Sequence, residues 1–264
     1  MAEKLVTEPV NVTVTGRVAT VEFNRPEALN ALNKDLIKSL AIKLKQISIS
    51  DDIDIVVLTG SGRAFSAGGD IKGMLKDTTQ DEFLSVMETI GELVITLYSL
   101  PKLTISAVQG AAAGLGLSLA LATDYIIAEK SSKIAMNFIK IGLIPDGGAH
   151  FFLEKLVGEA KAKKLIWNGE IMTADGAQAL GIVDEVAVDG NLASSLENKL
   201  QNWSMQPIQA MIKSKKIFAE NNRPQLLKSL ELEKFAQVKM LETEDHKEGI
   251  QAFLEKRQPQ FIGK

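Results

Sequence analysis

The sequence predicts an α/β fold with parallel strand pairing. Two mainly apolar runs, Ile53–Leu58 and Leu103–Val108, have the length and composition of buried strands. Segments in which apolar residues recur at helical spacing lie between these runs and after them. Strands that alternate with helices in this way favour a parallel sheet covered by helices.

The N-terminal half contains most of the expected strands. Val10 to Phe23 alternates apolar and polar residues around a glycine turn, which predicts a β-hairpin. Asn33 can cap the following helix, which has a stripe of apolar residues at Leu36, Ile37, Leu40, Leu44 and Ile47. The next expected elements are a strand over Ile53–Leu58, a helix over Gln80–Ser99, a strand over Leu103–Val108, a helix over Gly114–Ala122 and a strand over Asp124–Ala128.

The C-terminal part is predicted to be mostly helical. Helices are expected over Glu159–Asn168 and Thr173–Leu180, followed by a last short strand over Ile182–Val188. From Ala193 onward a helical pattern is expected throughout, with breaks at Pro207 and Pro224. We therefore expect two regions, residues 1–195 and residues 196–264.

Composition excludes several classes of protein. The chain of 264 residues has a formal net charge of −3, so no basic field argues for a nucleic-acid partner. It has no cysteine and two histidines, His150 and His246, which argues against a metal site. The N-terminus lacks the apolar segment of a secretory signal, and no apolar run approaches the roughly 20 residues that span a bilayer. We expect a cytoplasmic enzyme with no membrane association.

Two glycine-bearing segments, Ala64–Asp70 and Gly110–Gly116, each follow an expected strand. Glycine allows positive φ and a close approach of another group to the backbone. Two such turns that faced each other could direct two peptide N–H groups at one carbonyl oxygen, which suits acyl or enolate chemistry. The alternative is that both segments are ordinary tight turns.

Four segments in this order resemble the crotonase (enoyl-CoA hydratase/isomerase) superfamily: Asn24–Asn30, Ala64–Lys72, Gly110–Asp124 and Ile141–Gly148. The ending Glu248–Arg257 is similar to the C-terminal helix of that family. The resemblance covers almost the whole chain. It implies a crotonase (ClpP-like) spiral core of ββα turns in the first region. It also implies a helical second region that builds homotrimers, often paired into homohexamers.

The resemblance also implies roles for individual residues. The backbone N–H groups of Gly69 and Leu115 would hold the thioester carbonyl of an acyl-CoA and stabilise its enolate. Arg25 is placed near the CoA phosphates, although a solvated loop arginine is the alternative. The other residues that it places around CoA and the acyl group are Ala28, Ala67, Gly68, Asp70, Ile71, Gly114, Ser118, Phe138 and Pro145.

The chain departs from the hydratase pattern at two positions. Ser118 and Phe138 stand where hydratases of this family carry the two glutamates that activate water. Asp146 stands where isomerases of the superfamily carry a catalytic aspartate. Apolar neighbours are expected to raise the pKa of Asp146 toward neutrality. The alternative is a turn-forming aspartate that caps the next helix.

The leading hypothesis is an acyl-CoA isomerase, similar to 1,2-epoxyphenylacetyl-CoA isomerase and to enoyl-CoA isomerases. The alternatives are an enoyl-CoA hydratase that works with Asp146 alone and a non-catalytic acyl-CoA-binding scaffold. Ser118, His150 and Asp146 would also supply the side chains of a hydrolase triad. However, no nucleophile elbow surrounds Ser118, so His150 is expected to line the acyl pocket. His246 is expected on a solvated helix face. No cofactor is expected apart from the CoA of the substrate thioester.

Overall fold

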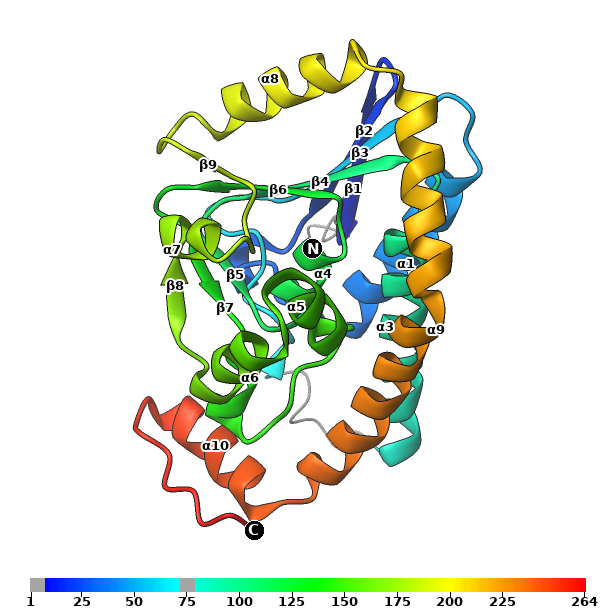
Figure 1. Cartoon of the computed structure of the whole chain (residues 1–264). Helices are drawn as coiled ribbons and strands as arrows, with labels where there is room; N and C mark the ends of the chain where they lie inside the picture. Colours follow the sequence, from blue (N-terminus) through cyan, green and yellow to red (C-terminus); the bar gives the residue numbers. More distant parts are fainter. Residues whose placement is uncertain (1–7, 72–78) are drawn as a thin grey trace, which may run out of the picture.

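Six strands form the main sheet, in the order β1-β2-β3-β4-β6-β9 (Figure 1). The structure is a computed structural model that describes residues 8–71 and 79–264, so Lys72 of the second resembling segment lies outside it. Strands β1 and β2 form the predicted antiparallel hairpin, and the other neighbours pair in parallel, which confirms the α/β prediction. The strands are β1 Val10–Thr15, β2 Val18–Phe23, β3 Ile55–Gly60, β4 Leu103–Val108, β6 Tyr125–Glu129 and β9 Glu185–Ala187.

A second, three-stranded sheet was not predicted. Its strands are β5 Ala111–Ala113, β7 Lys133–Ala135 and β8 Ile171–Thr173. Each has three residues, which is too short to show a period of two. Strand β5 consists of alanine, a residue that is depleted in strands. Strand β5 lies within the second glycine-bearing segment, Gly110–Gly116, so this sheet fixes the position of that segment.

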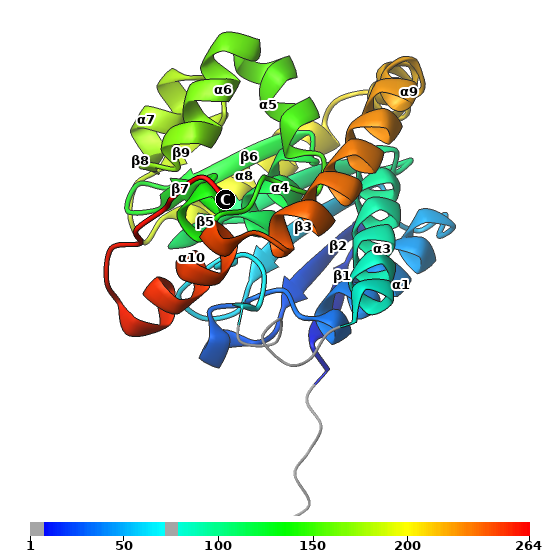
Figure 2. The same cartoon turned by 90° about the horizontal axis from the view of Figure 1, so that it is seen from below.

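Helices cover both faces of the main sheet (Figures 1 and 2). Helices α1 and α3 pack against one face, and the side chain of Asn33 accepts from the Leu36 N–H at 2.9 Å, as predicted for the cap of α1. Helix α8 covers the opposite face with Leu196, Leu200 and Trp203. The helices up to α8 are α1 Lys34–Ser48, α3 Gln80–Tyr98, α4 Leu115–Leu121, α5 Ala149–Val157, α6 Glu159–Asn168, α7 Ala174–Ala179 and α8 Leu192–Ser204, and two 3-10 turns are η1 Pro26–Ala28 and η2 Phe138–Ile141. Residue 195, the expected boundary, lies inside α8.

The long helix α9, Ile208–Leu241, lies beside α3 (Figure 2). It starts after Pro207 as predicted, but the predicted break at Pro224 is wrong, because α9 continues through this residue. Proline removes the N–H that would bond to the carbonyl four residues earlier. That carbonyl belongs to Glu220, and both residues are exposed, so water can solvate it.

Helix α10, Glu244–Glu255, packs against η2. The predicted solvated position of His246 is wrong, because its side chain is buried and its Nδ1 lies 2.7 Å from the Ile141 carbonyl oxygen. Burial lowers the pKa of His246. The expectation of helix to the end of the chain is also wrong, since α10 stops at Glu255 and residues 258–264 have no regular structure.

Candidate active site

The two glycine-bearing segments lie side by side. The Ser66 N–H donates to the Ala111 carbonyl at 2.9 Å, and the Ala113 N–H donates to the Ser66 carbonyl at 3.0 Å. Gly68 has φ of 98°, and a Cβ at this position would lie 2.8 Å from the Ala113 carbonyl oxygen. A side chain there would strain the backbone and collide with the neighbouring loop. The glycine therefore permits the close approach of the two segments.

Each segment contains, next to its last residue, an amide that has no acceptor in the described part of the chain. The N–H and C=O of Leu32 bond to Gly68 and Asp70 at 2.7 and 3.1 Å, and this bridge directs the Gly69 N–H away from residue 32. Leu115 is the first residue of α4, where an N–H has no acceptor within the helix. Among residues 8–71 and 79–264, neither the Gly69 nor the Leu115 N–H has a hydrogen-bond acceptor. Two unsatisfied donors on neighbouring loops are what an oxyanion hole requires.

Asp146 lies on a turn that packs against the first turn of α4. The Ser118 hydroxyl donates to the Asp146 carbonyl oxygen at 2.8 Å. Gly147 has φ of 65°, and a Cβ there would lie 2.7 Å from Leu115 Cδ1 and 3.0 Å from Ser118 Cβ. The structure thus brings the predicted carboxylic acid next to the residue that carries one of the two free amides.

The carboxyl group of Asp146 is buried and sparsely hydrogen bonded. Its Oδ2 accepts from Gln237 Nε2 at 3.3 Å. Its Oδ1 has no partner in the described part of the chain. Burial raises the pKa of Asp146 to about 7, the negative charge of Glu233 acts in the same direction, and the bond from Gln237 opposes both. The predicted direction is confirmed, but Glu233 was not foreseen as a contributor.

Glu233 and Gln237, both on α9, were missed by sequence reasoning. Glu233 Oε2 accepts from the Gly148 N–H at 2.7 Å, and its Oε1 lies 3.2 Å from the His150 N and 2.7 Å from His150 Nδ1. A signal was present, because Ala219 and Leu226 are buried at a spacing of seven and Glu233 continues it. A carboxylate on the apolar stripe of a helix indicates a polar partner in the core.

The hydrolase triad is not assembled. The Ser118 hydroxyl donates to backbone carbonyls, and His150 contacts Glu233 rather than Ser118. Phe138 lies against the second glycine-bearing segment, since a Cβ at Gly114 would lie 3.5 Å from the Phe138 ring. Ser118 and Phe138 stand at the two positions where the resemblance places the glutamates of hydratases. The Ser118 hydroxyl supports the Asp146 turn, and the Phe138 side chain is an apolar ring.

Arg25 and Asp70 form an ion pair at the edge of the site. Arg25 Nη2 lies 3.0 Å from Asp70 Oδ2, and its Nη1 donates to the Ala31 carbonyl at 2.5 Å. The Ala67 N–H donates to the Leu29 carbonyl at 2.9 Å. These contacts hold the loop around half-buried Ala28 against the loop that carries Ala67 and Ile71, and Pro145 is buried beside Asp146. Of the residues predicted to surround CoA and the acyl group, Arg25, Ala28, Ala67, Gly68, Asp70 and Ile71 thus lie on two joined loops, with the Arg25 guanidinium engaged within the protein.

No group of three metal-ligating side chains occurs among the residues that the structure describes. No described helix is both long and apolar enough to cross a membrane.

Comparisons with known proteins agree on one family. The enoyl-CoA hydratase/isomerase family profile matches residues 13–264. A Bacillus subtilis protein with a provisional enoyl-CoA hydratase/isomerase name is 46% identical over 254 residues, covering 96% of this chain and 99% of the relative. The 1,2-epoxyphenylacetyl-CoA isomerase of Escherichia coli is 39% identical over 252 residues, covering 94% and 95%.

A solved structure supports the same assignment. The crystal structure of an enoyl-CoA hydratase from Mycobacterium avium subsp. paratuberculosis superposes with a TM-score of 0.88 at 30% sequence identity. The match covers 96% of this chain and 98% of that one. It confirms the predicted crotonase fold with a helical C-terminal region. Sequence, fold and arrangement of the loops therefore agree: this chain belongs to the enoyl-CoA hydratase/isomerase family.

Proposed function

We propose that the protein isomerises unsaturated acyl-CoA thioesters through an enolate, with Asp146 as the group that moves the proton. The observation that carries the proposal is the burial of this carboxyl beside Leu115, with a pKa raised to about 7. At neutral pH both protonation states of Asp146 are populated. A base of this kind can remove a proton and return it.

The reaction needs one carboxyl group. The thioester oxygen of a 3-enoyl-CoA accepts from the Gly69 and Leu115 amides. The Asp146 carboxylate removes a proton from the α-carbon, and the electron pair delocalises over the thioester and the double bond as a dienolate. The Asp146 carboxylic acid then protonates the γ-carbon, which gives the 2-enoyl-CoA and restores the carboxylate. Stabilisation of the enolate oxygen by two fixed donors lowers the barrier to both steps.

Hydration is the competing function, because relatives in this family are named as hydratases. It requires activation of water in addition to protonation at the α-carbon. Glu233 is the carboxylate near Asp146, but both of its oxygens already accept from N–H groups. Ser118 and Phe138 supply no base. The geometry therefore favours isomerisation.

The test is the Asp146→Asn variant, assayed with a 3-enoyl-CoA by formation of the conjugated thioester. Loss of a general base predicts a decrease in kcat of roughly a hundredfold to ten thousandfold. Asp184→Asn is the control, because desolvation also raises the pKa of this aspartate and its Oδ2 accepts from the Ile126 N–H at 2.7 Å, away from the site. Full activity of Asp146→Asn would remove this residue from the mechanism.

Parallel assays separate the remaining alternatives. Hydration of crotonyl-CoA faster than isomerisation would favour the hydratase. A ring-epoxide thioester tests the substrate class named for the relative that is 39% identical. Tight binding of CoA esters without turnover of any of them would favour a scaffold.

We also propose that the chain forms homotrimers or homohexamers. Support comes from α9, where Ile217, Phe218, Leu232 and Phe235 are each more than half exposed. Apolar side chains concentrated on one helix are typical of an interface. Sedimentation of the purified protein as a monomer would contradict this proposal.

A further inference from the structure

Helix α9 presents two polar side chains to the site, one helical turn apart. Glu233 and Gln237 are 3% and 1% exposed, and residues at this spacing share a helix face. We propose that these two residues position the Asp146 carboxyl group and stabilise both of its protonation states. Helix α9 is then part of the acid–base machinery. The use of this arrangement in catalysis rests on the proposed isomerase function, whereas its effect on Asp146 does not.

Gln237 can serve either form of Asp146. In the structure its Nε2 donates to Oδ2, which stabilises the carboxylate. Its Oε1 is buried and has no partner in the described part of the chain. A half-turn of the amide about the Cγ–Cδ bond exchanges donor and acceptor, so that Oε1 accepts from the Asp146 carboxylic acid. One side chain thus offers a hydrogen bond before and after each proton transfer.

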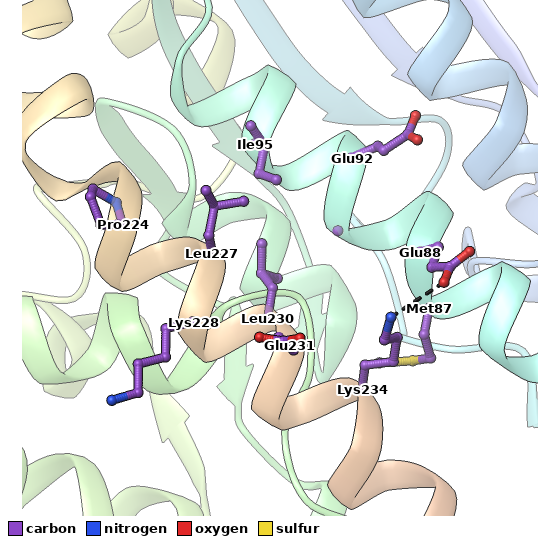
Figure 3. Close-up of a pocket in the computed structure, with 11 residues that line it drawn as sticks. Met87, Glu88, Glu92, Ile95, Pro224, Leu227, Lys228, Leu230, Glu231 and Lys234 are labelled. Carbon is purple, nitrogen blue, oxygen red and sulfur yellow. Dashed lines mark hydrogen bonds and ion pairs between the residues drawn. The ribbon is translucent and has the colours of Figure 1, made fainter.

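Glu233 supplies a fixed negative charge that favours the protonated form of Asp146. Both of its oxygens accept from N–H groups at the start of α5, at 2.7 Å from Gly148 and 3.2 Å from His150. These bonds keep the carboxylate in place without removing its charge. Lys234, the next residue on α9, pairs with Glu88 on α3 at 3.3 Å, across the groove between the two helices (Figure 3).

The other elements around Asp146 contribute two uncharged side chains and one histidine. Helix α4 offers Leu115 and Ser118, which are uncharged at neutral pH. Helix α5 offers His150, whose Nδ1 meets Glu233 at 2.7 Å and whose side chain is 40% exposed. Among the described residues, Glu233 is therefore the charge that acts on this carboxyl group, and Gln237 is its hydrogen-bond partner. Their effects on Asp146 have opposite signs.

Opposite signs allow a sharp experiment with Glu233→Gln and Gln237→Met. Both replacements keep the length of the side chain. Glu233→Gln removes the negative charge near Asp146, and Gln237→Met removes the hydrogen bond to Asp146 Oδ2. Protonation of Asp146 is followed by the infrared band of the carboxylic acid, assigned by its loss in Asp146→Asn, and by the pH profile of isomerisation. Glu88→Gln, which removes an exposed charge between α3 and α9, is the control.

We expect Glu233→Gln to move the titration of Asp146 to lower pH and Gln237→Met to move it to higher pH. On the acidic limb of the profile, activity relative to the alkaline plateau should rise roughly tenfold in the first variant and fall in the second. The control should leave the titration unchanged. Because the directions differ, either variant alone tests the proposal if the other does not fold.

The outcomes are distinguishable from failure of the proposed function. Unchanged titrations, or shifts in the same direction, would overturn the positioning role. Another outcome is a protein that titrates as expected, with the pH midpoint of the infrared band shifted in both variants, and yet isomerises no thioester. That result would support the role of α9 and contradict the proposed isomerase function. If Glu233 and Gln237 had a purely structural role, both variants would be less stable, and the pH midpoint of the infrared band would not change.

Discussion

Replacement of Asp146 by Asn should stabilise the protein at alkaline pH while it removes activity. The raised pKa means that the folded protein retains a proton on this group at pH values where the unfolded chain has lost it. The free energy of unfolding therefore falls as the pH rises from about 4 to about 7. The difference between the ordinary value of 3.8 and about 7 corresponds to about 4 kcal/mol, at 1.36 kcal/mol for each pH unit.

Asn has nearly the same shape and carries no charge, so it avoids this loss. At pH 4, where Asp146 is protonated in the folded state and about half protonated in the unfolded chain, the variant and the parent should differ by no more than about 1 kcal/mol. At pH 8.5 the variant should be more stable by up to about 4 kcal/mol. For a chain of this size that is roughly ten degrees in the unfolding temperature.

The measurement is urea unfolding of both proteins at equal concentration, at pH 4 and at pH 8.5. The comparison at pH 4 is the internal control, because it contains every effect of the substitution except most of the effect of the charge. Taking the difference between the two proteins cancels other groups that titrate on unfolding, such as Glu248, whose pKa is lowered to about 2 by Arg257. Equal differences at the two pH values would refute the buried, near-neutral carboxyl on which the proposed mechanism depends.

Three further substitutions test separate parts of the fold and site. Leu115→Pro removes one proposed oxyanion donor at a helix position that tolerates proline, and it should lower kcat by roughly a hundredfold to a thousandfold. Leu115→Ala keeps the N–H and is the control. Equal kcat values for these two variants would exclude the donor role. Asn30→Ala removes the side chain that donates to Ser61 and Ala64 and accepts from Arg25, with an expected loss of about 3 kcal/mol in urea unfolding, so a loss below about 1 kcal/mol would contradict this role. Pro224→Ala restores a helical N–H on an exposed face of α9 and should raise stability by about 1 kcal/mol or more, whereas destabilisation would show that the proline is required.

Local sequence patterns predicted the strands and helices whose formation depends on neighbouring residues. Strand β4 matches the expected range Leu103–Val108, and α6 matches Glu159–Asn168. Asn33 caps the N-terminus of α1, as predicted from its side chain. Such features depend on neighbours in the sequence. Pro224 and His246 were misjudged because solvent exposure and packing against a distant loop decide their roles.

The same distinction applies to the site. Gly69, Leu115 and Asp146 were named as candidates because the glycine-bearing turns and the Pro-Asp-Gly-Gly segment resemble motifs of the crotonase superfamily. Glu233 and Gln237 were not, because their partners lie 85 and 91 residues earlier in the chain. The spacing of seven from Ala219 and Leu226 is a sign of burial for Glu233, but it does not identify the partners of that carboxylate.

The position of Asp146 is better explained by chemistry than by folding. A neutral side chain of the same size would fill the space without the cost of ionisation above pH 7. Neighbouring Glu233 increases that cost. The charge of Glu233 disfavours ionisation of Asp146 and so reduces stability, yet it helps to bring the pKa of Asp146 near the pH at which a carboxyl group can both remove and return a proton. An arrangement that folding alone would disfavour is expected where the protein uses it, and here it lies against the helix turn that carries the Leu115 amide.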